Sequence, residues 1–170
     1  DQCGAADDRV AAEGGSAGGQ LVAAAATQAP ARFRAVLAQV PFVDVLTTML
    51  DPSLPLTITE QQEWGDPIAD PAAYDLIASY SPYETVPVGD FPALLITTSA
   101  NDTRVFVTEP AKWMARLRDR VTDDPVCRPL LMRTQLTSGH GGRSGRYQAW
   151  REIAWEWAVL LDLLGAADQG

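Results

Sequence analysis

The chain has 170 residues, enough for one domain with a sizeable core, and its 46% hydrophobic and 21% charged content is that of an ordinary globular protein. A net charge of −9 argues against a nucleic-acid partner, because phosphates call for clustered Lys and Arg. No run reaches the roughly 18 continuous apolar residues that a membrane helix needs, so we expect no membrane partner.

The cysteines and the first residues indicate the compartment of the protein and whether the chain is a fragment. Cys3 and Cys127 lie far apart in the sequence and lack metal-ligand spacing, so we expect a reducing compartment rather than a disulfide framework. The first residues lack the basic and apolar regions of a signal peptide. The chain begins at Asp1 without an initiator Met, and we therefore expect a fragment of a longer chain.

The first half of the sequence predicts two strands and a helix, followed by an irregular segment. Apolar runs predict strands at 8–13, where Gly14-Gly15 then turns the chain, and at 33–41. An Ala-rich helix is expected at 20–28. Residues 44–87 are rich in proline, with short helices expected at 59–64 and 71–79. So long a connection is typical of a functional segment.

The second half alternates between strand and helix. Strands are expected at 93–98 and 129–134, and a helix at 109–120, with Pro110 near its start. A long helix is expected at 144–164. Its apolar residues recur at helical spacing and predict an amphipathic stripe of Trp150, Ile153, Trp157, Leu160, Leu161 and Leu164.

Strands that alternate with helices predict an α/β fold with a parallel sheet of about four strands flanked by helices. Ser16, Asp102 and His140 each follow one of the predicted strands. Because ligands of such sheets bind beyond the carboxyl ends of the strands, we expect these three side chains to meet at one edge.

Residues 14–18 form the pentapeptide G-x-S-x-G between a predicted strand and a predicted helix, which is the context of a nucleophile elbow. Gly14 and Gly18 would leave room for a sharp turn at Ser16. The alternative for this loop is a plain turn or a phosphate-binding loop. The N–H of Ala17, at the start of the helix, is a candidate oxyanion donor.

A serine hydroxyl needs a base, and His140 is the one histidine of the chain. Asp102 would hold the imidazole and stabilise its charged form. Taken singly, Asp102 could close an Asx turn and His140 could be an exposed histidine without a role. The chain order Ser, Asp, His is that of α/β-hydrolases and favours a catalytic triad.

Other residues indicate no further chemistry. Trp113, Trp155 and Trp157 are expected in the core or in helix–helix contacts. The sequence shows no metal-ligand cluster, P-loop or dinucleotide fingerprint, so we expect neither metal nor cofactor.

Several long strings resemble the oligopeptidase B branch of the prolyl oligopeptidase family of serine peptidases. They are residues 13–19 (EGGSAGG), 38–51 (AQVPFVDVLTTMLD), 63–67 (EWGDP), 80–83 (YSPY), 109–113 (EPAKW) and 138–146 (SGHGGRSGR). The resemblance implies a cytoplasmic peptidase that cleaves short peptides after Arg or Lys, with an α/β-hydrolase domain gated by a β-propeller. Residues 1–165 would be the carboxyl-terminal part of that hydrolase domain and 166–170 a disordered tail.

The resemblance also implies roles for single residues. Ser16 is similar to the nucleophile, Asp102 to the triad acid and His140 to the base, while Arg104 resembles a contact to the substrate backbone. Glu60 keeps one carboxylate of the basic-specificity segment, and Gln62 stands where a second Glu is usual. A neutral amide cannot form a charge-assisted hydrogen bond with the substrate cation, which predicts a weakened preference for Arg or Lys. Alternatively, Glu60 and Glu63 are charges on the surface of a helix with no role in binding.

Parts of the family pattern are missing from this sequence. The resemblance implies a propeller, a first half of the hydrolase domain and a second oxyanion donor, a tyrosine, and we expect these from the same parent chain. Losing one oxyanion donor costs about 10²–10³ in rate. Two alternatives therefore stay open: an inactive fragment that needs the missing half, or a related aminopeptidase or esterase.

Overall fold

The computed structural model describes residues 10–122, 124–142 and 145–166. Cys3, the predicted beginning of the first strand at residues 8–9, and residues 167–170 of the predicted tail lie outside these ranges. Cys127 is exposed and carries a free thiol.

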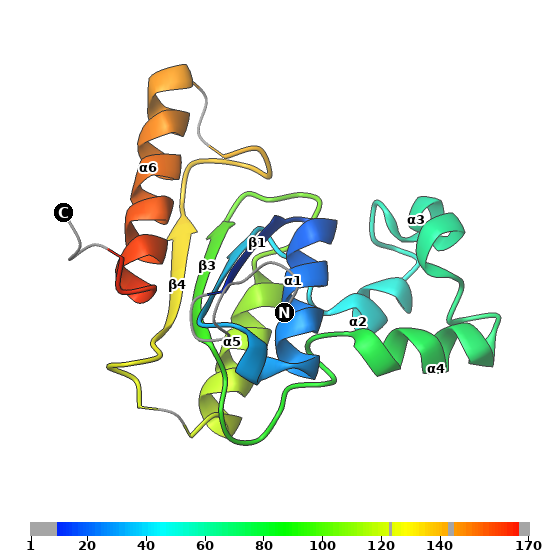
Figure 1. Ribbon diagram of the computed structural model, residues 1–170. Helices are drawn as coiled ribbons and strands as arrows, with labels where there is room; N and C mark the ends of the chain where they lie inside the picture. Colours follow the sequence, from blue (N-terminus) through cyan, green and yellow to red (C-terminus); the bar gives the residue numbers. More distant parts are fainter. Residues whose placement is uncertain (1–9, 123, 143–144, 167–170) are drawn as a thin grey trace.

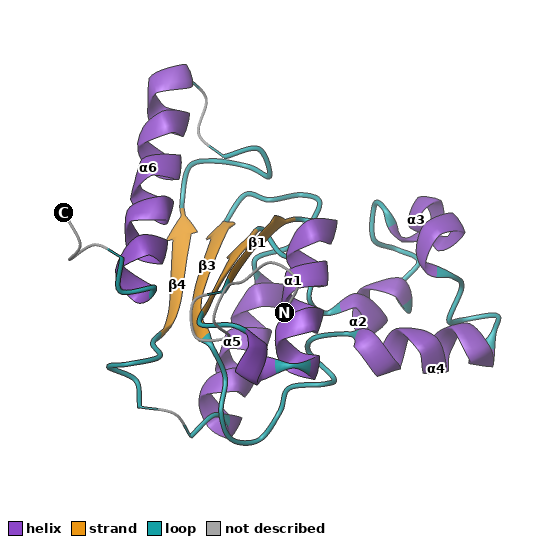
Figure 2. Cartoon of the chain, in the orientation of Figure 1, coloured by secondary structure: helices purple, strands orange, loops and turns teal. Residues whose placement is uncertain are grey.

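Four parallel strands form one sheet in the order β1 (Ala11–Gly15), β2 (Ala35–Gln39), β3 (Ala93–Ser99) and β4 (Leu130–Gln135) (Figure 2). The register pairs Gly14 with Ala38, Ala38 with Ile96 and Ile96 with Met132. Sequence order and spatial order agree, so all four carboxyl ends lie at one edge. The predicted α/β architecture with a four-stranded parallel sheet is confirmed.

Helices cover both faces of this sheet (Figure 1). The helices α1 (Ala17–Gln28) and α5 (Thr108–Arg120) lie on one face, and α6 (Arg146–Leu163) lies on the other. Predicted and observed bounds of α5 differ by one residue. A short 3₁₀ turn, η2 (Pro30–Arg32), links α1 to β2.

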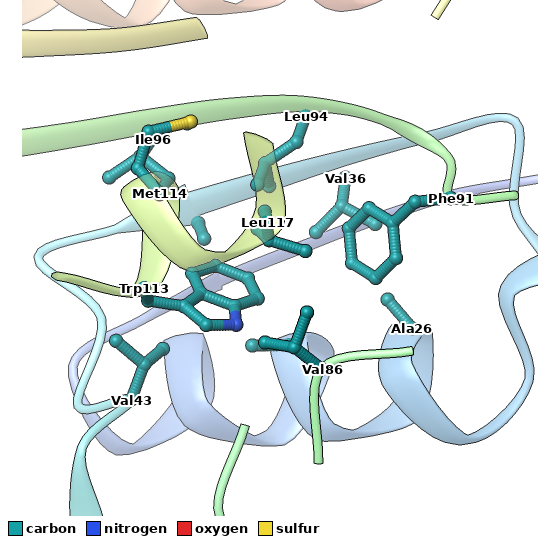
Figure 3. Close-up of a cluster of buried hydrophobic side chains, with 12 residues drawn as sticks. Ala26, Val36, Val43, Val86, Phe91, Leu94, Ile96, Trp113, Met114 and Leu117 are labelled. Atoms are coloured by element: carbon teal, nitrogen blue, oxygen red, sulfur yellow. The ribbon is translucent and has the colours of Figure 1, made fainter. Parts of the chain in front are cut away.

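The main core fills the space between the sheet and the helices α1 and α5 (Figure 3). Trp113 of α5 is fully buried and its ring meets Phe91 edge-on at 6.3 Å, as expected for a core tryptophan. Truncating so large a core side chain to alanine typically costs about 3–5 kcal/mol. The buried members are Ala23, Ala26, Val36, Ala38, Val43, Val86, Phe91, Leu94, Ile96, Trp113, Met114 and Leu117.

The apolar stripe of α6 is less buried than expected. Trp155 is 39% and Trp157 54% exposed, so the prediction that these two fill core or helix–helix contacts is wrong for the described residues. The helix instead meets the sheet through polar contacts: Gln39 donates to Glu156 at 2.7 Å, and the Arg133 guanidinium stacks over Trp155 at 4.1 Å. The stripe therefore leaves much apolar surface in solvent.

The proline-rich segment folds into three helices beside α1: α2 (Val45–Met49), α3 (Thr57–Trp64) and α4 (Pro71–Tyr80) (Figure 1). The short helices expected at 59–64 and 71–79 are confirmed with small extensions. The helix α2 was not expected in this proline-rich segment. It packs through a small core of Val45, Leu46, Met49 and Ile77.

The first strand–helix junction differs from the prediction by a few residues. Gly14 and Gly15 continue the ladder of β1 rather than turning the chain, since they pair with Ala38 and Gln39. The turn falls at Ser16, and α1 begins directly after it at Ala17. None of the helices in the described part combines the length and hydrophobicity required to span a lipid bilayer.

Candidate active site

Ser16 is held in a strained turn between β1 and α1. Its φ of 54° and ψ of −120° lie in a region that non-glycine residues rarely adopt. Gly14 makes the turn possible, because a Cβ there would come within 2.2 Å of the Gly18 carbonyl oxygen. This strand–turn–helix arrangement is the nucleophile elbow expected from the pentapeptide.

The space around Gly18 differs from the prediction. A Cβ at Gly18 would meet nothing within 4 Å, so the predicted clash at this glycine is wrong. The tight position is Gly19, where a Cβ would lie 2.8 Å from Pro41 Cα. The close approach is therefore between α1 and the chain that follows β2.

At the carboxyl edge, His140 lies within hydrogen-bond distance of both Ser16 and Asp102. His140 Nε2 lies 3.2 Å from Ser16 Oγ, and His140 Nδ1 lies 2.7 Å from Asp102 Oδ2. Ser16 follows β1, Asp102 follows β3 and His140 follows β4, so the sheet brings together residues up to 124 positions apart.

Asp102 is a fixed acceptor. Its side chain has no exposed surface, and its Oδ1 accepts from the backbone N–H groups of Arg104 at 2.8 Å and Val105 at 3.0 Å. Only Oδ2 is left for His140, which selects the tautomer with the proton on Nδ1 and an acceptor at Nε2. The imidazole is 19% exposed, so substrate can still reach it. The Asx turn considered in the sequence analysis is thus also present, and it orients the carboxylate.

The loop that carries His140 is tied to the ends of β3 and β4. Ser99 Oγ donates to the Ser138 carbonyl, and Ser138 Oγ donates to the Gln135 side chain. Asn101 Nδ2 adds a bond to Leu136 O at 2.9 Å. These contacts fix the loop that places the imidazole against Ser16.

A pocket of about 190 Å³ opens beside Ser16 and Ala17. Its walls are mostly apolar, with Phe42 and Trp64 packed edge-on at 5.6 Å. The position of Ala17 at the first turn of α1 also suits its N–H for a developing oxyanion. The lining consists of Ser16, Ala17, Phe42, Thr48, Met49, Leu56, Thr57, Glu60, Glu63, Trp64, Arg104 and Val105.

Two carboxylates of α3 enter the pocket lining. Glu60 is half-buried and accepts from Trp64 Nε1 at 3.1 Å, which holds its carboxylate in place. Glu63 lies three residues later and lines the same pocket, because residues i and i+3 share a helix face. Gln62 is exposed and is not part of the lining. Glu63, for which a helix-surface charge was the alternative, is exposed and also lines this pocket.

Arg104 is exposed at the edge of this pocket, two residues after Asp102. The backbone N–H of Arg104 is used by Asp102, which anchors the residue beside the pocket. The contact of Arg104 with the substrate backbone stays a prediction.

A buried charged cluster lies behind the pocket wall. Glu109 of α5 accepts from Thr48 Oγ1 at 2.9 Å and from the Asp44 backbone N–H at 3.2 Å, and Lys112 pairs with the Asp44 carboxylate. Burial raises the pKa of Glu109 to about 7, and the Asp44 charge adds to this rise. Thr48 also lines the pocket, so the cluster supports its wall.

Comparisons with known proteins agree with this geometry. Residues 2–167 match the prolyl oligopeptidase family. The chain is 48% identical to dipeptidyl aminopeptidase BI from Pseudoxanthomonas mexicana and 50% identical to protease 2 from Moraxella lacunata, covering 97% and 92% of this chain. Among solved structures, oligopeptidase B from Leishmania major superposes with a TM-score of 0.88 at 39% identity over 94% of this chain. Oligopeptidase B from Trypanosoma brucei gives the same TM-score at 43% identity.

The chain spans about 22% of the length of these relatives. The match nevertheless runs through nearly all of its own residues, from the elbow to the His140 loop. The chain belongs to the prolyl oligopeptidase family.

Proposed function

We propose that this chain carries the catalytic triad of a serine oligopeptidase that cleaves short peptides after Arg or Lys. The observation that supports the proposal most strongly is His140, whose two ring nitrogens lie 3.2 Å from Ser16 Oγ and 2.7 Å from Asp102 Oδ2. The relatives are much longer, so we also propose that the chain works within a longer protein, called the intact protein below. Its other segments would supply the second oxyanion donor.

The proposed reaction has two balanced steps. Ser16 Oγ attacks the peptide carbonyl carbon while His140 Nε2 takes the hydroxyl proton, and the carbonyl oxygen becomes an oxyanion beside the Ala17 N–H. The C–N bond then breaks, and His140 returns the proton to the leaving amine. A water molecule, deprotonated by the same nitrogen, hydrolyses the acyl-enzyme and restores Ser16.

The pocket beside Ser16 supports the preference for a basic side chain. Its apolar walls suit the methylene stem of Arg or Lys, while Glu60 and Glu63 offer carboxylates to the charged end. Gln62 lies outside the lining of this pocket, which argues against a weakening of the preference by its neutral amide.

The test is turnover of a short Arg-containing peptide by the intact protein and by its Ser16→Ala variant. We expect cleavage on the carboxyl side of Arg by the wild type and none by the variant, which lacks the nucleophile. Parallel Pro-containing peptides and simple esters separate this activity from related ones. Equal turnover of the Arg and Pro peptides, or activity retained in Ser16→Ala, would contradict the proposal.

An aminopeptidase activity is the second candidate, because the chain is 48% identical to a dipeptidyl aminopeptidase BI. The triad chemistry would be the same, and only the recognition of the peptide end would differ. Peptides with a free and an acetylated amino terminus distinguish the two: an endopeptidase cleaves both, whereas an aminopeptidase cleaves only the free one.

A further inference from the structure

The last residue of β2 and the three residues after it hold both backbone groups of Ser16. The Ser16 N–H donates to Gln39 O at 2.9 Å, and the Ser16 carbonyl accepts from Phe42 N at 3.2 Å. Residues 39–42, called the clamp segment below, therefore contact the nucleophile at two points. Pro41 of this segment also lies where a Cβ on Gly19 would stand, which fixes the distance between the segment and α1.

The two contacts require the clamp segment to turn sharply, and Val40 provides the turn. Val40 has a φ of 39°, and apart from Ser16 it is the one described non-glycine residue with positive φ. For a β-branched residue this is a genuine outlier, and the following proline restricts the backbone further. Strain of this kind costs about 1–3 kcal/mol and persists only where neighbouring contacts impose it. Here the Val40 N–H donates to Thr97 O at 2.7 Å.

The side chains of the clamp segment border two cavities beside the nucleophile. Phe42 lines the pocket that holds Glu60 and Glu63. Val40 lines a second cavity of about 400 Å³, together with Ser16 and His140. Glycine would adopt this positive φ with less conformational strain. The turn alone therefore does not explain why the residue is a valine. Val40 borders the same cavity as the two reacting residues.

We propose that Val40 is a positioning residue for the nucleophile. Its strained turn lets one segment hold the N–H and the C=O of Ser16, and its side chain limits the freedom of that segment beside His140. The role acts on the reaction step rather than on substrate binding, because Val40 does not line the side-chain pocket. The inference rests on the proposed function, since it assumes that Ser16 is the nucleophile.

The test compares Val40→Gly, Val40→Ala and Val40→Thr in the intact protein. Two readouts are used: kcat and KM for an Arg-containing peptide, and the rate of covalent labelling by a fluorophosphonate. We expect Val40→Gly to lower kcat and the labelling rate about tenfold with KM within twofold, because small displacements of reacting groups are costly. Val40→Thr keeps the branched shape and should stay within threefold of the wild type, with Val40→Ala between them.

The thermal unfolding temperature of each variant is also measured. Relief of strain predicts that Val40→Gly unfolds at the wild-type temperature or above it. Wild-type labelling and turnover in Val40→Gly, or a loss of folding in that variant, would overturn the proposed role of Val40. A wild-type protein that is not labelled at all would instead contradict the proposed function.

Discussion

At the scale of single residues, Asp102 decides the state of the imidazole. Its Oδ1 is occupied by two backbone N–H groups, and its Oδ2 faces His140 at 2.7 Å. An asparagine would fit the same space, but its side chain would present an N–H to one of these partners. The imidazole would then lose the acceptor that selects its catalytic tautomer.

We therefore predict that Asp102→Asn in the intact protein lowers kcat about 10⁴-fold, the size of effect seen when other serine-protease triads lose this carboxylate. Far-UV circular dichroism should be unchanged, because the side chains have the same shape. A variant that keeps more than a tenth of the wild-type kcat would show that His140 does not depend on this carboxylate.

The neighbours Gln62 and Glu63 form a matched pair for testing the pocket. Glu63 lines the pocket and Gln62 does not, although one bond separates the residues. An ion pair at an exposed site contributes up to about 1 kcal/mol. Glu63→Gln should therefore raise KM for an Arg peptide about fivefold, and less at high salt.

The control is Gln62→Glu, which changes the charge of α3 by one unit in the opposite direction at the preceding position. Its KM for the same peptide should stay within twofold of the wild type. If Gln62→Glu changes KM and Glu63→Gln does not, the assignment of pocket residues from this structure is wrong.

Much of the residue-level picture was accessible from the sequence, because each candidate follows a predicted strand. That rule places Ser16, Asp102 and His140 at one edge without any knowledge of the loops. The same rule does not predict which residues of a helix face the pocket. Choosing between Gln62 and Glu63 needs the start of α3 and its angle to the sheet, and the strained turn at Val40 has no sequence signal.

At the scale of elements, α5 and α2 are joined through a buried carboxyl group. Glu109 is 5% exposed, accepts from Thr48 and Asp44, and lies near the Asp44–Lys112 ion pair. Burial raises the pKa of Glu109 from 4.5 to about 7. The folded state therefore binds this proton more tightly than the unfolded state does.

The contribution of Glu109 to stability therefore falls as the pH rises. The stabilisation linked to the Glu109 proton is complete below pH 4.5 and is lost as the pH rises to about 7. The loss is on the order of 3 kcal/mol, since each pKa unit corresponds to about 1.4 kcal/mol. Glu109→Gln removes the titration, so we predict a flatter stability profile between pH 5 and 7.

The measurement is urea unfolding of this chain at several pH values, at a concentration where it is monomeric. Thr48→Val serves as the control, because it removes one hydrogen bond to Glu109 but keeps the carboxyl group. An unchanged slope in Glu109→Gln would mean that another group causes the pH dependence.

The elements were predicted best where the pattern was long and periodic. The bounds of α5 and α4 differ by one residue at one end from the predicted ranges. The helix α2 was missed because its stability comes from contacts with Glu109 and from its small core, which the local sequence does not reveal. The end of β1 was misplaced because Gly14-Gly15 is compatible with both strand and turn.

At the scale of the whole molecule, an edge strand and the apolar stripe of one helix are exposed. Strand β1 pairs only with β2 among the described residues, so its other edge offers free backbone groups. The stripe on α6 exposes Trp150, Ile153 and Trp157 by about half. Unpaired edges and exposed apolar patches favour association.

We predict that this chain on its own associates as its concentration rises, whereas the intact protein does not. Sedimentation velocity over a range of concentrations measures both. Ala11→Lys, which puts a charge on the edge strand β1, should reduce the association. A chain that stays monomeric at high concentration would show that these surfaces do not cause association.

The central claim is that His140 activates Ser16. The most direct measurement is mass spectrometry of the intact protein after reaction with a fluorophosphonate, with and without His140→Ala. The account predicts one adduct, on the peptide that contains Ser16, formed at least a hundredfold more slowly in His140→Ala. An adduct on another residue, or an equal rate of labelling without the imidazole, would contradict it.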